Sequence, residues 1–214
     1  MSEPRVVRGT RAALVLGYLA MVGVVLIVPD GRRWFWTVVI AALPLVWVVG
    51  GFHLWRRICP LAFFSQLPRL LGRPGERKVS GWLAEHGMLA QAGVMVVALS
   101  ARLLWINGSR AGLAAFLVGA ALAAVLAGAS LRGKSWCNFL CPVGLVETLY
   151  TEPSRLLGEA NSQCPTCSAC TTQCPDIDVE HAYWKDSSSR DRRLVYFAWP
   201  GIVLGFYVHF ALQA

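Results

Sequence analysis

The 214-residue chain has the composition of a membrane protein. Hydrophobic residues make up 56% of it and charged residues 15%, whereas typical soluble domains hold about 45–50% and about 25% of these two classes. This composition excludes a soluble globular domain and a disordered chain. The net charge of +8 does not indicate a nucleic-acid partner, because the basic residues flank apolar runs, as they do in the loops of membrane proteins.

Five apolar runs are long enough to cross a membrane, for which a helix needs about 20 residues. They cover residues 12–28, 34–54, 82–106, 111–131 and 194–212. The third run is the least apolar, because it is interrupted by Glu85, His86, Gln91 and Arg102. The sequence therefore predicts an all-α membrane protein with about five transmembrane helices, arranged as two hairpins plus one.

The basic residues predict the orientation. Of the 20 Lys and Arg residues, 16 precede the first run or lie in the loops after the second and fourth runs. The positive-inside rule places the N-terminus and both loops in the cytoplasm, and the C-terminus outside. We expect a multi-pass protein of the bacterial inner membrane, in contact with lipid. Residues 1–131 are predicted to form a four-helix membrane region with a Cys-Pro loop at 55–80. Residues 132–192 are predicted to form a cytoplasmic segment, and residues 193–214 a final membrane helix.

Four of the seven cysteines form a C-x2-C-x2-C-x3-C-P run, namely Cys164, Cys167, Cys170 and Cys174. This is the pattern with which bacterial ferredoxins bind iron–sulfur clusters, the fourth cysteine serving the other cluster where two are present. Zinc sites use two separated C-x2-C pairs, and disulfides are rare in a reducing cytoplasm. The run therefore predicts a small, cytoplasmic, ferredoxin-like insert that holds a 4Fe–4S cluster.

The three remaining cysteines follow the two predicted hairpins. Cys137 and Cys141 repeat the C-x3-C-P step of the ferredoxin run, and Cys59 also precedes a proline. Aligned on Cys-Pro, Cys59 matches Cys141 and Trp55 matches Cys137, which suggests an internal repeat that has lost one cysteine. All seven cysteines are predicted on the cytoplasmic side, so Cys59, Cys137 and Cys141 join the run as candidate cluster ligands. A dithiol pair of Cys137 and Cys141 acting in metal reduction is an alternative.

The cysteine count limits the number of clusters. Two clusters with only thiolate ligands need eight cysteines, and the chain has seven. The sequence favours one 4Fe–4S cluster, completed by a remote cysteine, or by Cys174 itself. A second cluster would need a ligand from a partner chain or from one of Asp176, Asp178, His53 and His181.

Other polar residues in the apolar runs are candidates for redox chemistry. Glu85, His86 and Arg102 could bind a quinone, since an ionisable residue inside a membrane is by default a functional hypothesis. A haem held by His86 and His209 is disfavoured, because the predicted topology puts them near opposite faces. The tryptophans near the ends of the runs fit an aromatic belt at the membrane surface. Seven of the nine are placed there: Trp34, Trp36, Trp55, Trp82, Trp105, Trp136 and Trp199.

Over residues 34–214, the chain resembles the membrane-bound polyferredoxins, which include the NapH, NosR and CcoG types. The resemblance rests on Trp136-Cys137-x3-Cys141-Pro142-Val143-Gly144 after a hairpin, on the Cys59-Pro60 counterpart and on the run at 164–175. Members of this family often carry two ferredoxin runs and two cysteines in the first C-x3-C-P step. This chain has one run, and Trp55 replaces one cysteine. The resemblance implies electron transfer at the membrane, by fewer clusters than in other members.

The expected function is that of an electron-transfer subunit, a component of an oxidoreductase system rather than a complete enzyme. It would pass electrons between a 4Fe–4S cluster at the cytoplasmic face and the quinone pool or a redox partner protein. The alternative is an iron–sulfur membrane protein used in metalloenzyme assembly or redox sensing.

Overall fold

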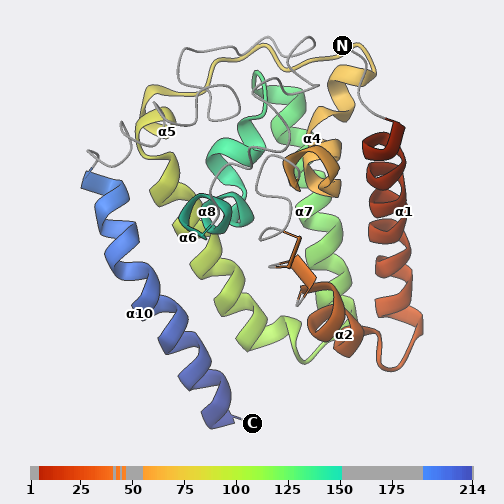
Figure 1. Ribbon diagram of the computed structural model, residues 1–214, viewed down its shortest axis with the longest axis vertical. Coiled ribbons are helices and arrows are strands. Elements are labelled where there is room, and N and C mark those ends of the chain that lie inside the picture. Colours follow the sequence, from red (N-terminus) through yellow and green to blue (C-terminus); the bar gives the residue numbers. More distant parts are fainter. Residues whose placement is uncertain (1–4, 41, 44, 47–54, 151–189, 214) are drawn as a thin grey trace.

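The computed structural model describes residues 5–40, 42–43, 45–46, 55–150 and 190–213, and these are mostly helical. Four long helices run along the molecule (Figure 1): α1 (Arg5–Ile27), α6 (Gly87–Ala101), α7 (Arg110–Ser130) and α10 (Arg190–Gln213). The shorter α-helices are α2 (Gly31–Trp34), α4 (Pro60–Leu70), α5 (Gly81–Glu85) and α8 (Pro142–Tyr150). Three π-helical turns are η1 (Phe35–Val39), η2 (Arg102–Ile106) and η3 (Trp136–Leu140).

Three helices in the described part of the chain are long and apolar enough to cross a membrane: α1, α6 with its extension η2, and α7. At 20 to 23 residues, each is about 30 Å or more in length, which is the thickness of the hydrocarbon core. These helices confirm the first, third and fourth predicted runs. The fifth run forms the 24-residue helix α10, whose membrane crossing stays a prediction. The second run is helical as far as it is described, and residues 47–54 lie outside the described residues.

The third membrane helix begins later than its predicted run, because the chain turns at His86. Helix α5 starts at Ser80, whose hydroxyl accepts a hydrogen bond from the Leu83 N–H at 3.2 Å, and it ends at Glu85. Gly87 then opens α6 against η3. A Cβ atom at Gly87 would lie 2.7 Å from the Phe139 ring, so this glycine allows the close approach.

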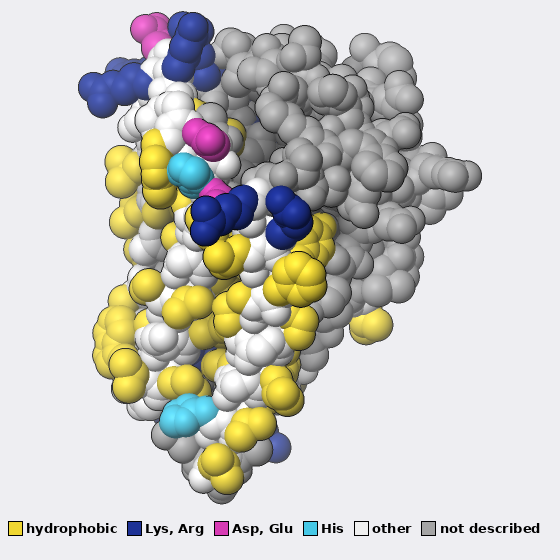
Figure 2. Space-filling model, turned by 90° about the vertical axis from the view of Figure 1, so that its left-hand side faces the viewer, with side chains coloured by type: hydrophobic (Ala, Val, Ile, Leu, Met, Phe, Trp, Pro, Cys, Tyr) yellow, Lys and Arg dark blue, Asp and Glu magenta, His cyan; other side chains and the backbone are white. Residues whose placement is uncertain are grey.

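The charge pattern predicts that the N-terminus and the loop after the second run lie on the same side, and both lie at one end of the molecule (Figure 1). The N-terminus, α5 and the 71–80 loop lie at one end, and the C-terminus and the α1–α2 and α6–α7 turns lie at the other (Figure 1). Figure 2 shows apolar side chains over the face formed by α6 and α10, with charged side chains gathered towards one end. Which end faces the cytoplasm stays a prediction.

Helix α4 begins directly after Cys59 and packs closely on α7. A Cβ atom at Gly128 of α7 would overlap the carbonyl oxygen of Ser65 in α4, so the backbones touch there. The loop after α4 then pairs with the end of α7: Gly75 N–H donates to the Gly128 carbonyl at 3.1 Å, and Arg77 N–H to the Ser130 carbonyl at 3.2 Å. This packing holds the segment around Cys59 beside the chain that leads from α7 to Cys137.

Candidate metal centre

Each of the two Cys-Pro steps in the described part of the chain starts a helix. Pro60 is the first residue of α4 and Pro142 the first of α8, a position where the missing N–H of proline costs no hydrogen bond. The preceding residues, Cys59 and Cys141, have extended ψ angles of 127° and 118°, as the proline ring requires. Both thiols therefore sit at helix N-termini, where the helix dipole favours a negative thiolate.

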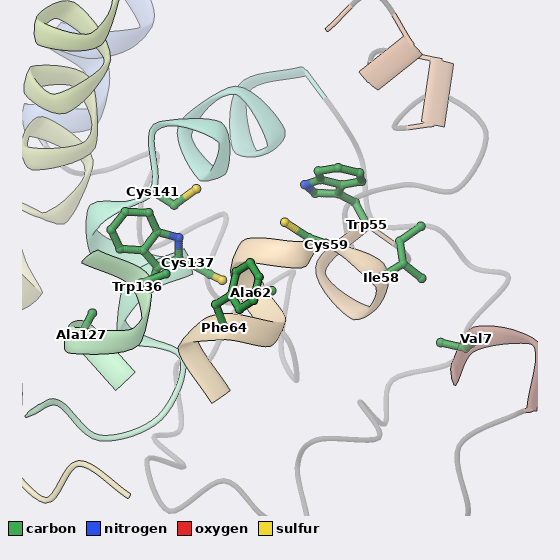
Figure 3. Close-up of a cluster of buried hydrophobic side chains, with 11 residues drawn as sticks. Val7, Trp55, Ile58, Cys59, Ala62, Phe64, Ala127, Trp136, Cys137 and Cys141 are labelled. Atoms are coloured by element: carbon green, nitrogen blue, oxygen red, sulfur yellow. The ribbon is translucent and has the colours of Figure 1, made fainter. Parts of the chain in front are cut away.

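The structure brings three of the seven cysteines together. Cys59, Cys137 and Cys141 are buried, with exposures of 8%, 6% and 6%. In Figure 3 the sulfur atoms of Cys59 and Cys141 point towards the same space between the two segments, and the sulfur of Cys137 lies at its edge. The residues that line this pocket, called the thiol pocket below, are Trp55, Arg56, Cys59, Ala62, Trp136, Cys137, Cys141 and Gly144.

The backbone hydrogen bonds show how the two copies of the repeat differ. Cys59 N–H donates to the Trp55 carbonyl, four residues earlier, and Cys141 N–H donates to the Trp136 carbonyl, five residues earlier, both at 2.7 Å. The second copy thus contains one extra residue, accommodated by the π-helical turn η3. In hydrogen-bonding terms Trp55 corresponds to Trp136 rather than to Cys137, and the extra residue is what adds the second thiol.

Two contacts hold Cys137 in place. The side-chain amide of Gln91, 5% exposed in α6, donates to the Cys137 carbonyl oxygen at 2.9 Å. Gly144 of α8 lies against the same carbonyl, since a Cβ atom there would be 2.5 Å from it. Helices α6 and α8 therefore position this cysteine, and neither Gln91 nor Gly144 was identified as a site residue from the sequence.

Basic side chains are buried on both pocket segments. Arg56, Arg57 and Lys134 are 4%, 6% and 7% exposed. Arg56 lines the pocket itself, and its Nη1 donates to the Asn138 side-chain oxygen at 2.9 Å. A guanidinium beside thiols favours their anionic form. The sequence showed these residues only as loop charges; their place directly before each cysteine segment was the available signal.

The donor set fits a cluster better than a single ion. One zinc ion would need its thiolates about 2.3 Å from a common point, and among the described residues no three Cys, His, Asp or Glu side chains could share one ion. In a 4Fe–4S cluster each of four cysteines binds its own iron. Three buried thiols around one pocket supply ligands of the right kind and leave one iron for a fourth ligand.

The other predicted ligands lie outside the described residues: Cys164, Cys167, Cys170 and Cys174, and also His53, Asp176, Asp178 and His181. The helices on either side of the 151–189 segment are described, and they meet. Leu145 of α8 is fully buried in a cluster with Val195 and Trp199 of α10. The two helices that flank residues 151–189 in the sequence, α8 and α10, therefore pack against each other, and α8 begins directly after Cys141.

The candidate quinone and haem residues His86, Arg102 and His209 do not form one site. Nδ1 of His86 contacts Oδ2 of Asp191, at the start of α10. His209 lies five turns further along α10, about 27 Å away by the helical rise, so His86 and His209 cannot bind one haem. The Arg102 guanidinium stacks on Trp36, with 3.9 Å between its carbon and the ring centroid.

The tryptophans divide into two groups. Trp34, Trp82 and Trp105 are 59%, 62% and 54% exposed, as an aromatic belt requires. The belt interpretation is wrong for three others, because Trp55, Trp136 and Trp199 are only 8%, 8% and 6% exposed. Tertiary packing places the first two in the thiol pocket and the third against α8.

One known protein family matches a part of the chain that includes two of the pocket cysteines. A family model for a 4Fe-4S binding domain matches residues 114–158, which include Cys137 and Cys141 and end before the cysteine run. The match covers well under half of the chain and supports an iron–sulfur protein. No curated protein and no solved structure matches the chain.

Proposed function

We propose that the chain is a membrane electron-transfer protein in which the thiol pocket holds a 4Fe–4S cluster. The observation that carries this proposal is the convergence of Cys59, Cys137 and Cys141 on one buried pocket. The family match over Cys137 and Cys141 supports it, and so does the resemblance to membrane-bound polyferredoxins.

The fourth ligand is proposed to come from the ferredoxin run, with Cys174 as the first candidate. In ferredoxins the cysteine before the proline serves a different cluster from the three that precede it. The reach is sufficient: the 24 residue-to-residue steps from Tyr150 to Cys174 can span up to about 80 Å. Cys164, Cys167 and Cys170 would then need an outside ligand to hold a second cluster.

A bound 4Fe–4S cluster supplies one-electron transfer. The pocket residues would perform three tasks around it: ligation, stabilisation of negative charge and exclusion of water. Cys59, Cys137 and Cys141 would provide the thiolates. The helix N-termini next to Cys59 and Cys141 and the Arg56 charge would stabilise negative charge. Trp55 and Trp136 exclude water, which is one of the determinants of a cluster's potential.

The orientation of the chain in the membrane and its redox partners are also part of this proposal. The pocket end of the molecule is proposed to face the cytoplasm of a bacterial inner membrane, because the basic loops gather at that end. Electrons would be exchanged with quinone or with a redox partner protein. Arg102 is a candidate quinone contact, because its guanidinium lies in a membrane-spanning helix and stacks on an aromatic ring.

Cysteine variants of the anaerobically purified protein test the site. We expect at least four iron and four sulfide per chain in the wild type, from the composition of one cluster. Cys59→Ala, Cys137→Ala and Cys141→Ala should each lose iron and the EPR signal of the dithionite-reduced protein. Ser65→Ala, at a buried position on α4 that does not line the pocket, is the matched control and should keep both.

Two results would contradict parts of the proposal. If all three pocket variants keep the iron content and EPR signal of the wild type, the cluster is held by the 164–174 run alone. If the pocket cluster is present but is not reduced by quinol or by any physiological partner, the alternative of a role in assembly or sensing is favoured.

A further inference from the structure

The indole Nε1 of Trp136, in the lining of the thiol pocket, has no hydrogen-bond partner among the described residues. Trp136 lines the pocket and is 8% exposed, and its indole Nε1 is fully buried without an acceptor. Buried donors are nearly always hydrogen-bonded, so each exception calls for an explanation, such as a bound ion, water or ligand. The explanation here must be found in the immediate surroundings of Trp136.

Trp136 belongs to a core cluster of buried hydrophobic residues that includes Phe64, Ala124 and Ala127, and none of these three has a side-chain acceptor. The Trp136 carbonyl is already used by the Cys141 N–H. In Figure 3 the nitrogen of Trp136 lies on the edge of the indole ring that is turned towards the sulfur atoms of Cys137 and Cys141. A sulfur atom in the pocket would supply the acceptor that this donor lacks.

We infer that the Trp136 indole N–H donates a hydrogen bond to a sulfur atom of the iron–sulfur cluster or of its thiolate ligands. This inference rests on the proposed function. Hydrogen bonds to cluster sulfurs help to set the reduction potential, because they stabilise the more negative, reduced state. Trp136 is thus a positioning and tuning residue of the site, and its role is separate from ligation.

The rest of the chain supplies two comparison residues. Trp55 occupies the corresponding hydrogen-bonding position in the first copy of the repeat and lines the same pocket with the same exposure, 8%, but its nitrogen is not among the unsatisfied atoms. Trp36 also has a buried Nε1 without an acceptor, but it lies on η1, away from the pocket. Trp36 therefore controls for the loss of a buried indole N–H elsewhere.

Redox titration followed by EPR tests the inference on the anaerobically purified full chain. Trp136→Phe should keep the iron and sulfide content of the wild type and shift the midpoint potential to a more negative value. Trp36→Phe should leave the potential unchanged. A Trp136→Phe protein with an intact cluster and the wild-type potential would overturn the inference and leave the proposed function standing.

A second measurement needs no substitution, in case Trp136→Phe fails to hold the cluster. The reduced wild-type protein, labelled with ¹⁵N in the tryptophan indoles, should show a ¹⁵N hyperfine coupling in pulsed EPR. Absence of this coupling, in a sample whose cluster signal is present, overturns the inference alone. A wild-type protein without iron and sulfide overturns the proposed function and this inference together.

Discussion

Cys59 and Cys141 occupy the same local position in two parts of the chain that are far apart in sequence. Each donates its backbone N–H to a tryptophan carbonyl at 2.7 Å, and each is followed by a proline that begins a helix. Figure 3 shows the two sulfur atoms facing the same space. The two Cys-Pro segments thus contribute to one shared pocket and do not form two separate sites.

The close fit of Gly144 against Cys137 predicts a sensitive position. A methyl group at Gly144 would lie 2.5 Å from the Cys137 carbonyl and 3.0 Å from the Gln91 amide nitrogen. Gly144→Ala should therefore displace Cys137, lower the stability by about 1–3 kcal/mol and reduce the iron content. Thermal unfolding in detergent and iron analysis measure both effects.

Gly93 provides the control for that substitution. It lies within α6, and nothing would meet its Cβ atom within 4 Å. Gly93→Ala should be neutral or stabilise by roughly 0.5–1 kcal/mol, as is usual for this change inside a helix. Equal effects of the two substitutions would show that Gly144 has no special steric role.

The hydrogen bond from Gln91 predicts a link between α6 and cluster retention. Gln91→Met keeps a side chain of similar length but removes the donor to the Cys137 carbonyl, at a cost of about 1–3 kcal/mol for a buried group left unsatisfied. The variant should unfold at a lower temperature and lose iron faster to a chelator. Met95→Leu, one turn further along α6, conserves side-chain volume. It should change neither the unfolding temperature nor the rate of iron loss to the chelator.

Arg56 predicts an electrostatic effect on the cluster. Arg56→Met removes a buried positive charge from the pocket lining, so the reduced state loses stabilisation and the midpoint potential should become more negative. Arg56→Lys keeps the charge and should stay closer to the wild type. Arg110→Met, at the start of α7, is the control. If the Met and Lys variants at position 56 shift the potential equally, geometry rather than charge is responsible.

The contact between His86 and Asp191 joins α6 to the start of α10. The two side chains are 29% and 21% exposed, and solvent screening limits a pair of this kind to about 1 kcal/mol or less. Asp191→Asn should therefore change the unfolding temperature little, but it should speed tryptic cleavage after Arg190 and Arg193. A double-mutant cycle with His86→Gln should show that the two single effects are not additive. Additive effects would mean that the two residues act independently.

Composition and hydropathy were sufficient to predict the apolar helices at 12–28, 82–106 and 111–131. These helices depend on local hydrophobicity, which the sequence shows directly. The sequence also identified Cys59, Cys137 and Cys141 as one candidate set, because each precedes a proline or stands four residues before such a cysteine.

Only the tertiary structure decided which groups share the pocket. Trp136 and Gly144 belong to one sequence motif with Cys137 and Cys141. Gln91 comes from α6, and no local pattern connects it to that motif. The exposed or buried state of each tryptophan was likewise a matter of packing, since Trp82 and Trp136 both stand at the ends of apolar runs yet are 62% and 8% exposed. Sequence periodicity reports which helices can form, whereas the side chains that meet between helices depend on how those helices pack against one another.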